Sequence, residues 1–430
     1  MAKRIDEQNH WHRLDNTANI FPVTTSKNES NVFRLSMTLI APVAPELLQQ
    51  ALEMMLPRFP GFAVLLRRGA FWFYLNENNA VPTIREESDY PCRAINPAQN
   101  NDFLFRVTYY DKRINVEIFH VLTDGTGGVQ FLRALCCQYL MLAYPTRFTE
   151  EEKAKHWYEQ HVAETNDGYV SNYRPTKKTS FSIGKGYRIR GERLLLDTLS
   201  VVHTYIPLQP LLALCRGKGV TITQYVTACI AWGVYTTQLR KRPSKHPLNM
   251  YLPINLRKLF GTNTALNFFS NIYISLDMQA DDLHFNEILA EVKKQFEEKI
   301  SRGNMLEKIS YTVGSGYNPA VRFVPLPLKN LALRIMFKQG AKSSSLAFSN
   351  VGDMSLPAPF AQYVTGASFL LSCVPREPIK FAACSANGLF TLSFASMLRS
   401  QEIQQAIVQK MAEDGLEVTI ETNGVDYESV

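Results

Sequence analysis

The chain lacks any apolar run that could cross a bilayer, which takes about 20 residues in a helix. Its longest apolar segments, near residues 369–374 and 392–397, have only the length of strands. The opening residues 1–7 lack the apolar core of a signal peptide. These absences exclude a membrane-spanning protein, and we expect a cytoplasmic location.

The sequence lacks the Cys-x-x-Cys pattern, and its seven cysteines are scattered and odd in number. Cys136 and Cys137 are adjacent on one expected helix, which favours reduced thiols over a disulfide framework. His10 and His12 have no acidic or cysteine partner close by, so no metal site is predicted.

Several catalytic signatures are missing as well. The sequence has no Gly-x-Ser-x-Gly elbow, which argues against a serine hydrolase of that kind. It has no phosphate loop ending in Gly-Lys-Ser/Thr and no Gly-x-Gly-x-x-Gly fingerprint. We therefore predict no permanently bound cofactor.

What the chain does have is the run 119–128, Phe-His-Val-Leu-Thr-Asp-Gly-Thr-Gly-Gly. An alternating apolar segment leads into His120 and predicts a half-buried strand, with a hairpin turn before it at residues 111–112. An apolar segment, 129–143, follows and predicts a buried helix. His120 is thus expected where a strand ends, a position that holds a side chain rigidly beside a channel.

This pattern suits proton transfer, because histidine has an unperturbed pKa near neutral pH. We expect Asp124 to fix the loop through a buried ion pair or backbone N–H groups, not to act as a relay. Three glycines are expected to permit positive φ and close approach of a substrate: Gly125, Gly127 and Gly128. The alternative is a core histidine in a glycine-rich turn.

The motif His120-x-x-x-Asp124-Gly125 resembles the signature of the chloramphenicol acetyltransferase-like superfamily. The chain is most similar to its bacterial alcohol acetyltransferases. The likeness extends over nearly the whole chain through weaker segments: 11–16, 58–62, 253–257, 267–269 and 348–352. Leu266 stands where the family usually has a glycine before Asn-Phe.

The resemblance implies direct acyl transfer from a coenzyme A thioester to a small hydroxyl or amine acceptor. His120 would be the general base, and Ser349 and Asn350 are the candidate donors to the oxyanion. Turn formation before Gly352 is the alternative role for that pair. Arg58 and Arg257 are the candidate partners of Asp124, and the sequence does not choose between them.

Much of the net charge of +7 falls in residues 174–193. The basic residues there indicate either a solvated linker or a docking surface for the phosphates of coenzyme A. The candidates for phosphate binding are Lys177, Lys178, Lys185 and Arg188. Charge alone gives no reason to expect nucleic acid as a partner.

Strands and helices mix without strict alternation, which predicts an α+β fold. With the resemblance, this becomes two chloramphenicol acetyltransferase-like lobes with mixed sheets and an active-site tunnel between them. The lobes are expected at 1–175 and 196–430, joined by a basic crossover at 176–195, and the duplicated length favours a monomer. Expected strands are 31–40, 63–67, 70–75, 198–206, 249–253, 269–276, 344–350, 362–374, 379–386 and 388–396; expected helices are 45–56, 129–143, 209–216, 221–239, 285–302 and 401–415.

Two other functions compete with this one. A condensation-type catalyst would take its acyl group from a carrier protein, but its usual motif has a second histidine where this chain has Phe119. A non-catalytic binding protein could keep the fold, although an intact His120 and Asp124 argue against it.

Overall fold

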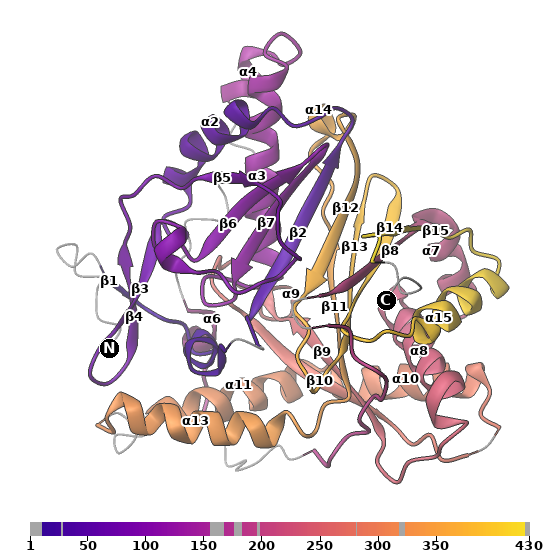
Figure 1. Cartoon of the computed structure of the whole chain (residues 1–430). Coiled ribbons are helices and arrows are strands. Elements are labelled where there is room, and N and C mark those ends of the chain that lie inside the picture. The colour runs from indigo at the N-terminus through magenta and orange to yellow at the C-terminus, as the bar shows by residue number, and fades with distance from the viewer. Residues whose placement is uncertain are drawn as a thin grey trace.

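The computed structural model describes residues 11–26, 29–154, 167–175, 183–195, 198–280, 282–317 and 323–425. These residues form two lobes, each a mixed sheet with helices packed on it (Figure 1). The α+β class with mixed sheets is thereby confirmed. None of the described helices has the length and apolarity to cross a membrane.

The sheet of the N-terminal lobe has the strand order β12-β2-β7-β6-β5. All neighbours in it are antiparallel except β5 and β6. Helices α2 (Pro45–Met55) and α3 (Gly125–Ala143) contact each other, and α3 packs on β2 and β7. The strands are β2 (Val32–Leu39), β5 (Ile84–Glu86), β6 (Phe105–Tyr110), β7 (Arg113–Phe119) and β12 (Val364–Leu371).

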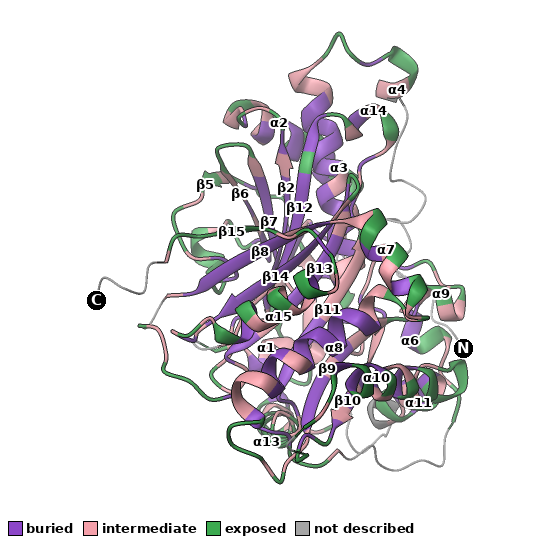
Figure 2. Cartoon of the chain, turned by 90° about the vertical axis from the view of Figure 1, so that its right-hand side faces the viewer, coloured by how far each residue is buried: buried purple, intermediate pink, exposed green. Residues whose placement is uncertain are grey.

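The sheet of the C-terminal lobe has the order β10-β9-β11-β13-β14-β8-β15. Helix α8 (Ile222–Val234) is almost fully buried between that sheet and its neighbours α7, α10 and α15, as the purple ribbon of Figure 2 shows. The strands are β8 (Ser200–Pro207), β9 (Leu248–Asn255), β10 (Phe269–Leu276), β11 (Leu346–Asp353), β13 (Ile379–Ala386), β14 (Leu389–Ser396) and β15 (Thr419–Thr422), and the helices are α7 (Leu208–Gly217), α10 (Phe285–Lys299) and α15 (Glu402–Glu413).

Strand β12 joins the two halves. It comes from the C-terminal part of the chain but pairs along its length with β2, as the edge strand of the N-terminal sheet. It also contacts β13 and β14 of the other sheet (Figure 1). The division of the chain at 176–195 stays a proposal, and any such division must allow for this returning strand.

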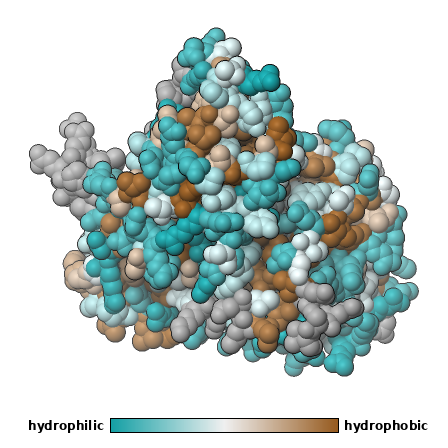
Figure 3. Space-filling model, turned by 45° about the horizontal axis from the view of Figure 1, so that its top comes forward, coloured by the Kyte–Doolittle hydropathy of each residue, from teal (hydrophilic) through white to brown (hydrophobic). Residues whose placement is uncertain are grey.

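The remaining elements lie around the lobes. A small sheet has the order β1-β4-β3, and α11 and α13 run along the lower side of the molecule in Figure 1. The space-filling view shows mostly hydrophilic side chains on one face, with small separate hydrophobic groups between them (Figure 3). The elements are β1 (Trp11–Arg13), β3 (Val64–Arg68), β4 (Phe73–Glu77), α1 (Phe21–Thr24), α4 (Glu150–Ala154), α6 (Gly168–Ser171), α9 (Arg257–Phe260), α11 (Arg302–Tyr317), α13 (Leu326–Gly340) and α14 (Ala358–Ala361), with short helical turns at Ala18–Ile20, Leu56–Arg58, Pro97–Gln99 and Tyr235–Leu239.

Candidate active site

His120 follows the last residue of β7, and its backbone N–H donates to the carbonyl of Asn31 at 3.0 Å. Aromatic rings surround the imidazole. Phe21 stacks on it with the centroids 4.5 Å apart, Phe33 meets it edge-on at 5.2 Å, and Phe269 of β10 lies at 5.5 Å. The residue as a whole is half-buried. Since β10 belongs to the other lobe, His120 lies where the two lobes meet.

The tautomer of His120 follows from its hydrogen bonds. The ring nitrogen Nδ1 lies 3.0 Å from Oδ1 of Asn267. The amide nitrogen of Asn267 donates to the Asp15 carboxylate at 2.8 Å and to the carbonyl of His120 at 3.2 Å. A backbone carbonyl can only accept, so the bond to the carbonyl of His120 fixes the orientation of the amide. Oδ1 therefore faces Nδ1, the proton lies on Nδ1, and Nε2 carries the lone pair.

Asp15 anchors this chain of hydrogen bonds. Its carboxylate also accepts from the backbone N–H groups of Thr17 and Ala18, at 2.9 and 2.7 Å. Asp15 and Asn267 are both buried. Burial raises the pKa of Asp15 to about 7, and the hydrogen bonds from Asn267 and Ala18 oppose that rise. The result is a rigid Asp15–Asn267–His120 chain, which we call the amide relay.

Burial also lowers the pKa of His120 below its ordinary value of 6.5, while the charge of Asp124 raises it in part. Burial disfavours the charged imidazolium because the protein interior solvates it less well than water does. At neutral pH the ring is therefore neutral, which is the form that can accept a proton.

Asp124 caps the N-terminus of α3. Its Oδ1 accepts from the N–H groups of Thr126 and Gly127, at 3.0 and 3.2 Å. Its Oδ2 accepts from Arg257 at 2.8 Å and from the N–H of Phe268 at 2.9 Å. Both oxygens are thus occupied by donors, so the carboxylate holds the loop and the first turn of the helix in place.

Arg257 is the partner that the structure selects for Asp124. Its other nitrogens donate to the carbonyls of Thr264 and Leu266, at 2.9 and 2.7 Å. The ion pair therefore fixes the segment that ends at Asn267. Arg58, the other candidate, is exposed in the turn Leu56–Arg58 and does not pair with Asp124.

The expected role of the glycines in the motif needs correction. None of Gly125, Gly127 and Gly128 has a positive φ, because all three lie in the first turn of α3. Close packing requires them. A Cβ on Gly125 would lie 2.6 Å from Val351, one on Gly127 would lie 2.0 Å from the hydroxyl of Thr123, and one on Gly128 would lie 2.9 Å from Leu35. The helix also begins four residues earlier than expected.

Ser349 and Asn350 lie on β11 and face opposite sides of its sheet. In the parallel pairing with β13, Ser349 lies opposite Ala382, which belongs to the N-terminal core. Asn350 lies opposite Ala383, which belongs to the C-terminal core. Since successive side chains alternate between faces, Ser349 faces the N-terminal lobe.

Asn350 faces α8 instead. Its amide nitrogen donates to the hydroxyl of Thr223 at 3.1 Å, and its oxygen accepts from the N–H of Gly352 at 2.9 Å. Both groups thus have local structural partners. Val351 contacts Gly125, so the end of β11 adjoins the first turn of α3.

The basic crossover is described only in part. Lys177 and Lys178 lie outside the described residues. Lys185 and Arg188 are exposed on the segment 183–195, which precedes the C-terminal lobe in the chain and packs against it. There the carbonyl of Gly184 accepts a hydrogen bond from Asn249, near the start of β9. The other end of β9, at Asn255, adjoins the site. The two positions are six residue steps apart along the strand, or about 20 Å, so the structure does not bring these cations to His120.

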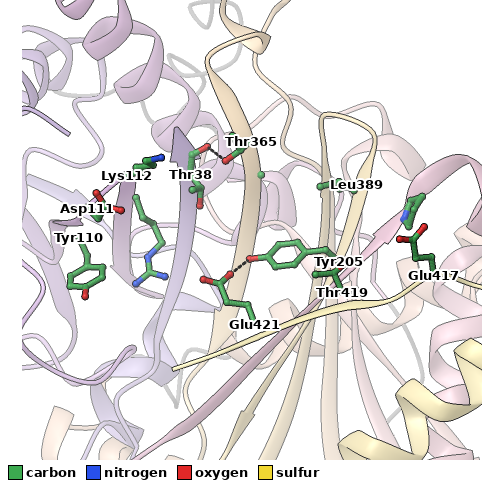
Figure 4. A pocket seen from close by; sticks show the side chains of 13 residues that line it. Thr38, Tyr110, Asp111, Lys112, Tyr205, Thr365, Leu389, Glu417, Thr419 and Glu421 are labelled. Atoms are coloured by element: carbon green, nitrogen blue, oxygen red, sulfur yellow. Dashed lines mark hydrogen bonds between the residues drawn. The ribbon is translucent and has the colours of Figure 1, made fainter. Parts of the chain in front are cut away.

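Two pockets are described, and neither is lined by His120. The one in Figure 4 has a volume of about 550 Å³ and lies at the far end of β2 and β7. In it Tyr205 donates to Glu421 at 2.6 Å, and Thr365 donates to the carbonyl of Thr38 at 3.2 Å. Acidic and basic residues mix along its wall. The tunnel between the lobes stays a prediction.

The sequence did not assign a role to two residues of the site, Asp15 and Asn267. Both lie in segments, 11–16 and 267–269, that carry the weaker part of the resemblance, which was the only signal for them. Their function depends on a contact between residues 252 positions apart in the chain. No periodicity or local motif reports such a contact.

No family model and no curated protein matches this chain. Solved structures do match it. TRI101 of F. sporotrichioides, complexed with coenzyme A and T-2, aligns with a TM-score of 0.63 and 11% identity, over 95% of this chain and 99% of that one. TRI3 trichothecene 15-O-acetyltransferase from Fusarium sporotrichioides aligns at 0.61 and 11%, over 94% and 95%.

A wax ester synthase/diacylglycerol acyltransferase from Marinobacter aquaeolei VT8 aligns with a TM-score of 0.56 and 14% identity, over 94% of this chain and 100% of that one. These likenesses cover nearly the full length of both partners. They establish that the chain has the two-lobed fold of these acyltransferases.

Proposed function

We propose that this protein is an acyltransferase that moves an acyl group, most simply acetyl, from a coenzyme A thioester to a hydroxyl or amine. The observation that carries the proposal is the amide relay, which leaves Nε2 of His120 unprotonated at the junction of the lobes. Asp124 and Arg257 support it by fixing the loop and the segment before Asn267.

The reaction needs one base and no covalent enzyme intermediate. As the acceptor oxygen or nitrogen attacks the thioester carbonyl, its proton moves to Nε2 of His120. The tetrahedral intermediate then collapses, the C–S bond breaks, and the imidazolium returns the proton to the departing thiolate. The products are an ester or amide and free coenzyme A. The amide relay keeps Nδ1–H paired while the ring is charged.

Ser349 is our candidate donor to the oxyanion, since its side chain faces the N-terminal lobe and Val351, two residues further on, adjoins the first turn of α3. We leave Asn350 a structural role. For the phosphates of the donor we keep the basic crossover, with Lys177, Lys178, Lys185 and Arg188, because the acyl and phosphate ends of an extended coenzyme A are far apart. The acceptor is a small alcohol or amine, and the protein is a cytoplasmic monomer.

The test is release of free thiol from acetyl-CoA with a panel of alcohols and amines. Acyl transfer predicts acceptor-dependent release and a matching ester or amide by mass spectrometry. Release only from an acylated carrier protein would indicate a condensation-type catalyst instead. No release from either donor, with binding of acetyl-CoA retained, would favour a binding protein.

Asn267→Ala is expected to lower kcat about 10- to 100-fold, because an unpaired ring N–H in a buried site costs about 1–3 kcal/mol. The KM for acetyl-CoA should change little. The rate of the wild type should fall as the pH drops through the pKa of His120, below 6.5. The bond to Asn267 raises that pKa, so the variant should lose activity at a still lower pH.

Asn249→Ala is the matched control for this variant. Asn249 is equally buried and donates to the carbonyls of Gly184 and Ser343, at the other end of β9. This variant should lower the stability of the protein, and its rate should fall over the same acidic pH range as that of the wild type. If Asn267→Ala kept the kcat of the wild type and lost activity at the same acidic pH, the amide relay would have no positioning role.

Ser349→Ala is expected to lower kcat about 10²- to 10³-fold, the usual effect of losing one oxyanion donor. The protein should unfold at the same denaturant concentration as the wild type. Asn350→Ala is the comparison, because it should lower stability by removing the contacts to Thr223 and Gly352 and change kcat less. The opposite ranking of the two variants in kcat would assign the oxyanion to Asn350.

A further inference from the structure

Helix α13 (Leu326–Gly340) exposes large apolar side chains to solvent. Met336, Leu328, Leu331 and Ile335 are 64, 59, 58 and 50% exposed, and Phe323 just before the helix is 79% exposed. A run of this size is unusual, because the exposed apolar groups of a monomer are normally scattered singly. We call these residues the apolar row.

The apolar row covers the outer face of the helix. Leu328, Leu331 and Ile335 follow the spacing i, i+3, i+7, which puts them on one side. Leu326, Leu333 and Phe337 lie on the other side and are buried or half-buried. The helix thus shows apolar side chains to solvent as well as to the protein. An ordinary surface helix has polar side chains on its outer face.

Positive charge borders the apolar row. At 100° per residue, Arg334 and Lys338 lie along one edge of the outer face and Lys329 along the other. Between Glu307 and Asp353 the sequence has no acidic residue and six basic ones: Lys308, Arg322, Lys329, Arg334, Lys338 and Lys342. Long basic side chains at the borders of an apolar face can lie along it and still reach polar surroundings.

Aromatic side chains extend the surface. The hairpin between β3 and β4 carries Phe71 and Trp72, which are 38 and 43% exposed. The start of α13 is fixed to it, since the N–H of Leu326 donates to the carbonyl of Ala70 at 2.8 Å and Lys329 donates to that of Phe71 at 3.0 Å. Tryptophan beside a basic apolar helix is typical of segments that lie in a membrane interface.

We propose that α13 and the β3–β4 hairpin dock this protein on an anionic lipid bilayer surface, with the apolar row among the headgroups and the basic borders against lipid phosphates. The charge pattern favours this occupant over a second copy of the chain. A symmetric dimer would place the same basic patch on both partners, with no acidic residue of α13 to balance it.

The docking surface adjoins the candidate active site. Helix α13 contacts α1, where Arg334 donates to the carbonyl of Val23 at 3.0 Å. Phe21 of the same short helix stacks on the ring of His120. A membrane under α13 would thus lie one short helix away from the base. The proposal concerns lipid binding and does not depend on acyl transfer.

The experiment is flotation of the purified protein with vesicles of phosphatidylcholine alone or mixed with phosphatidylglycerol. We expect the wild type to float with the mixed vesicles, and less so at high salt. The double variant Leu331→Asp/Ile335→Asp should stay at the bottom of the gradient. Lys338→Glu/Lys342→Glu should bind more weakly, by about fivefold for each positive charge removed.

The matched control is Val81→Asp/Ile420→Asp, which places two acidic residues at other exposed apolar positions, 55 and 52% exposed. It should float like the wild type. Circular dichroism and the midpoint of urea unfolding check that every variant is folded. The proposal is overturned if the wild type stays unbound, if the control loses binding equally, or if light scattering shows a dimer that only the α13 variant dissociates.

Discussion

His120→Ala is expected to lower turnover about 10²- to 10⁴-fold, the range that a general base contributes. The ring is the only group of the amide relay that presents an unprotonated nitrogen at the junction of the lobes. The fold should persist, because His120 follows the end of a strand and is only half-buried as a residue. Its loss leaves Oδ1 of Asn267 unpaired, at a cost of about 1–3 kcal/mol.

Thiol release from acetyl-CoA measures the effect, and urea unfolding checks the fold. His12→Ala is the matched control, since His12 is exposed on β1 and should not change the rate. Comparable turnover in a folded His120→Ala protein would remove the assignment of the base. An imidazole added to the assay should restore part of the lost rate if the missing group is a proton acceptor.

Asp124→Ala is expected to lower both stability and rate. Removing one partner of a buried ion pair costs about 3–5 kcal/mol, because the remaining charge stays buried and unpaired. Here the charge left behind is Arg257, whose side chain is 10% exposed. The rate should fall as well, since the pair fixes the carbonyl of Leu266 and the segment that carries Asn267.

The measurement is the midpoint of urea unfolding at an unchanged slope, together with kcat. Arg257→Met should lower the free energy of unfolding less than Asp124→Ala does, because the Asp124 carboxylate also caps α3. The double variant should lower it by less than the sum of the two single variants. A variant with unchanged unfolding and a reduced rate would instead give Asp124 a direct part in the reaction.

Local pattern was enough to predict most of the sheets. The expected strand 269–276 has the bounds of β10, and 31–40 differs from β2 by one residue at each end. Alternating apolar residues specify a strand and its buried face. They do not specify its neighbour, so the pairing of β12 with β2 was missed.

Helix α13 could not be predicted for a related reason. Its apolar residues occur on both faces, so the sequence shows no 3.6-residue period against a polar side. Two prolines, Pro325 and Pro327, stand at its start, where a first helical turn tolerates them. What makes the segment a helix with exposed apolar residues is its contact with the hairpin and α1, which only the fold brings about.

The site divides in the same way. His120 and Asp124 belong to one short motif, and the sequence was sufficient to single them out. The choice of Arg257 over Arg58 and the link from Asp15 to Asn267 both depend on how the lobes meet. The expectation of positive φ at the three glycines was wrong. Tight packing and positive φ both require glycine, so the sequence alone does not distinguish the two causes.

The returning strand β12 also sets an order of events during synthesis. Until residue 371 has left the ribosome, β2 has one side of its backbone donors and acceptors open, next to a sheet that is otherwise ready to form. An open strand edge of this kind pairs readily with other chains. The nascent N-terminal half therefore has to wait for more than 300 later residues of its own chain, between β2 and β12, before its sheet is closed.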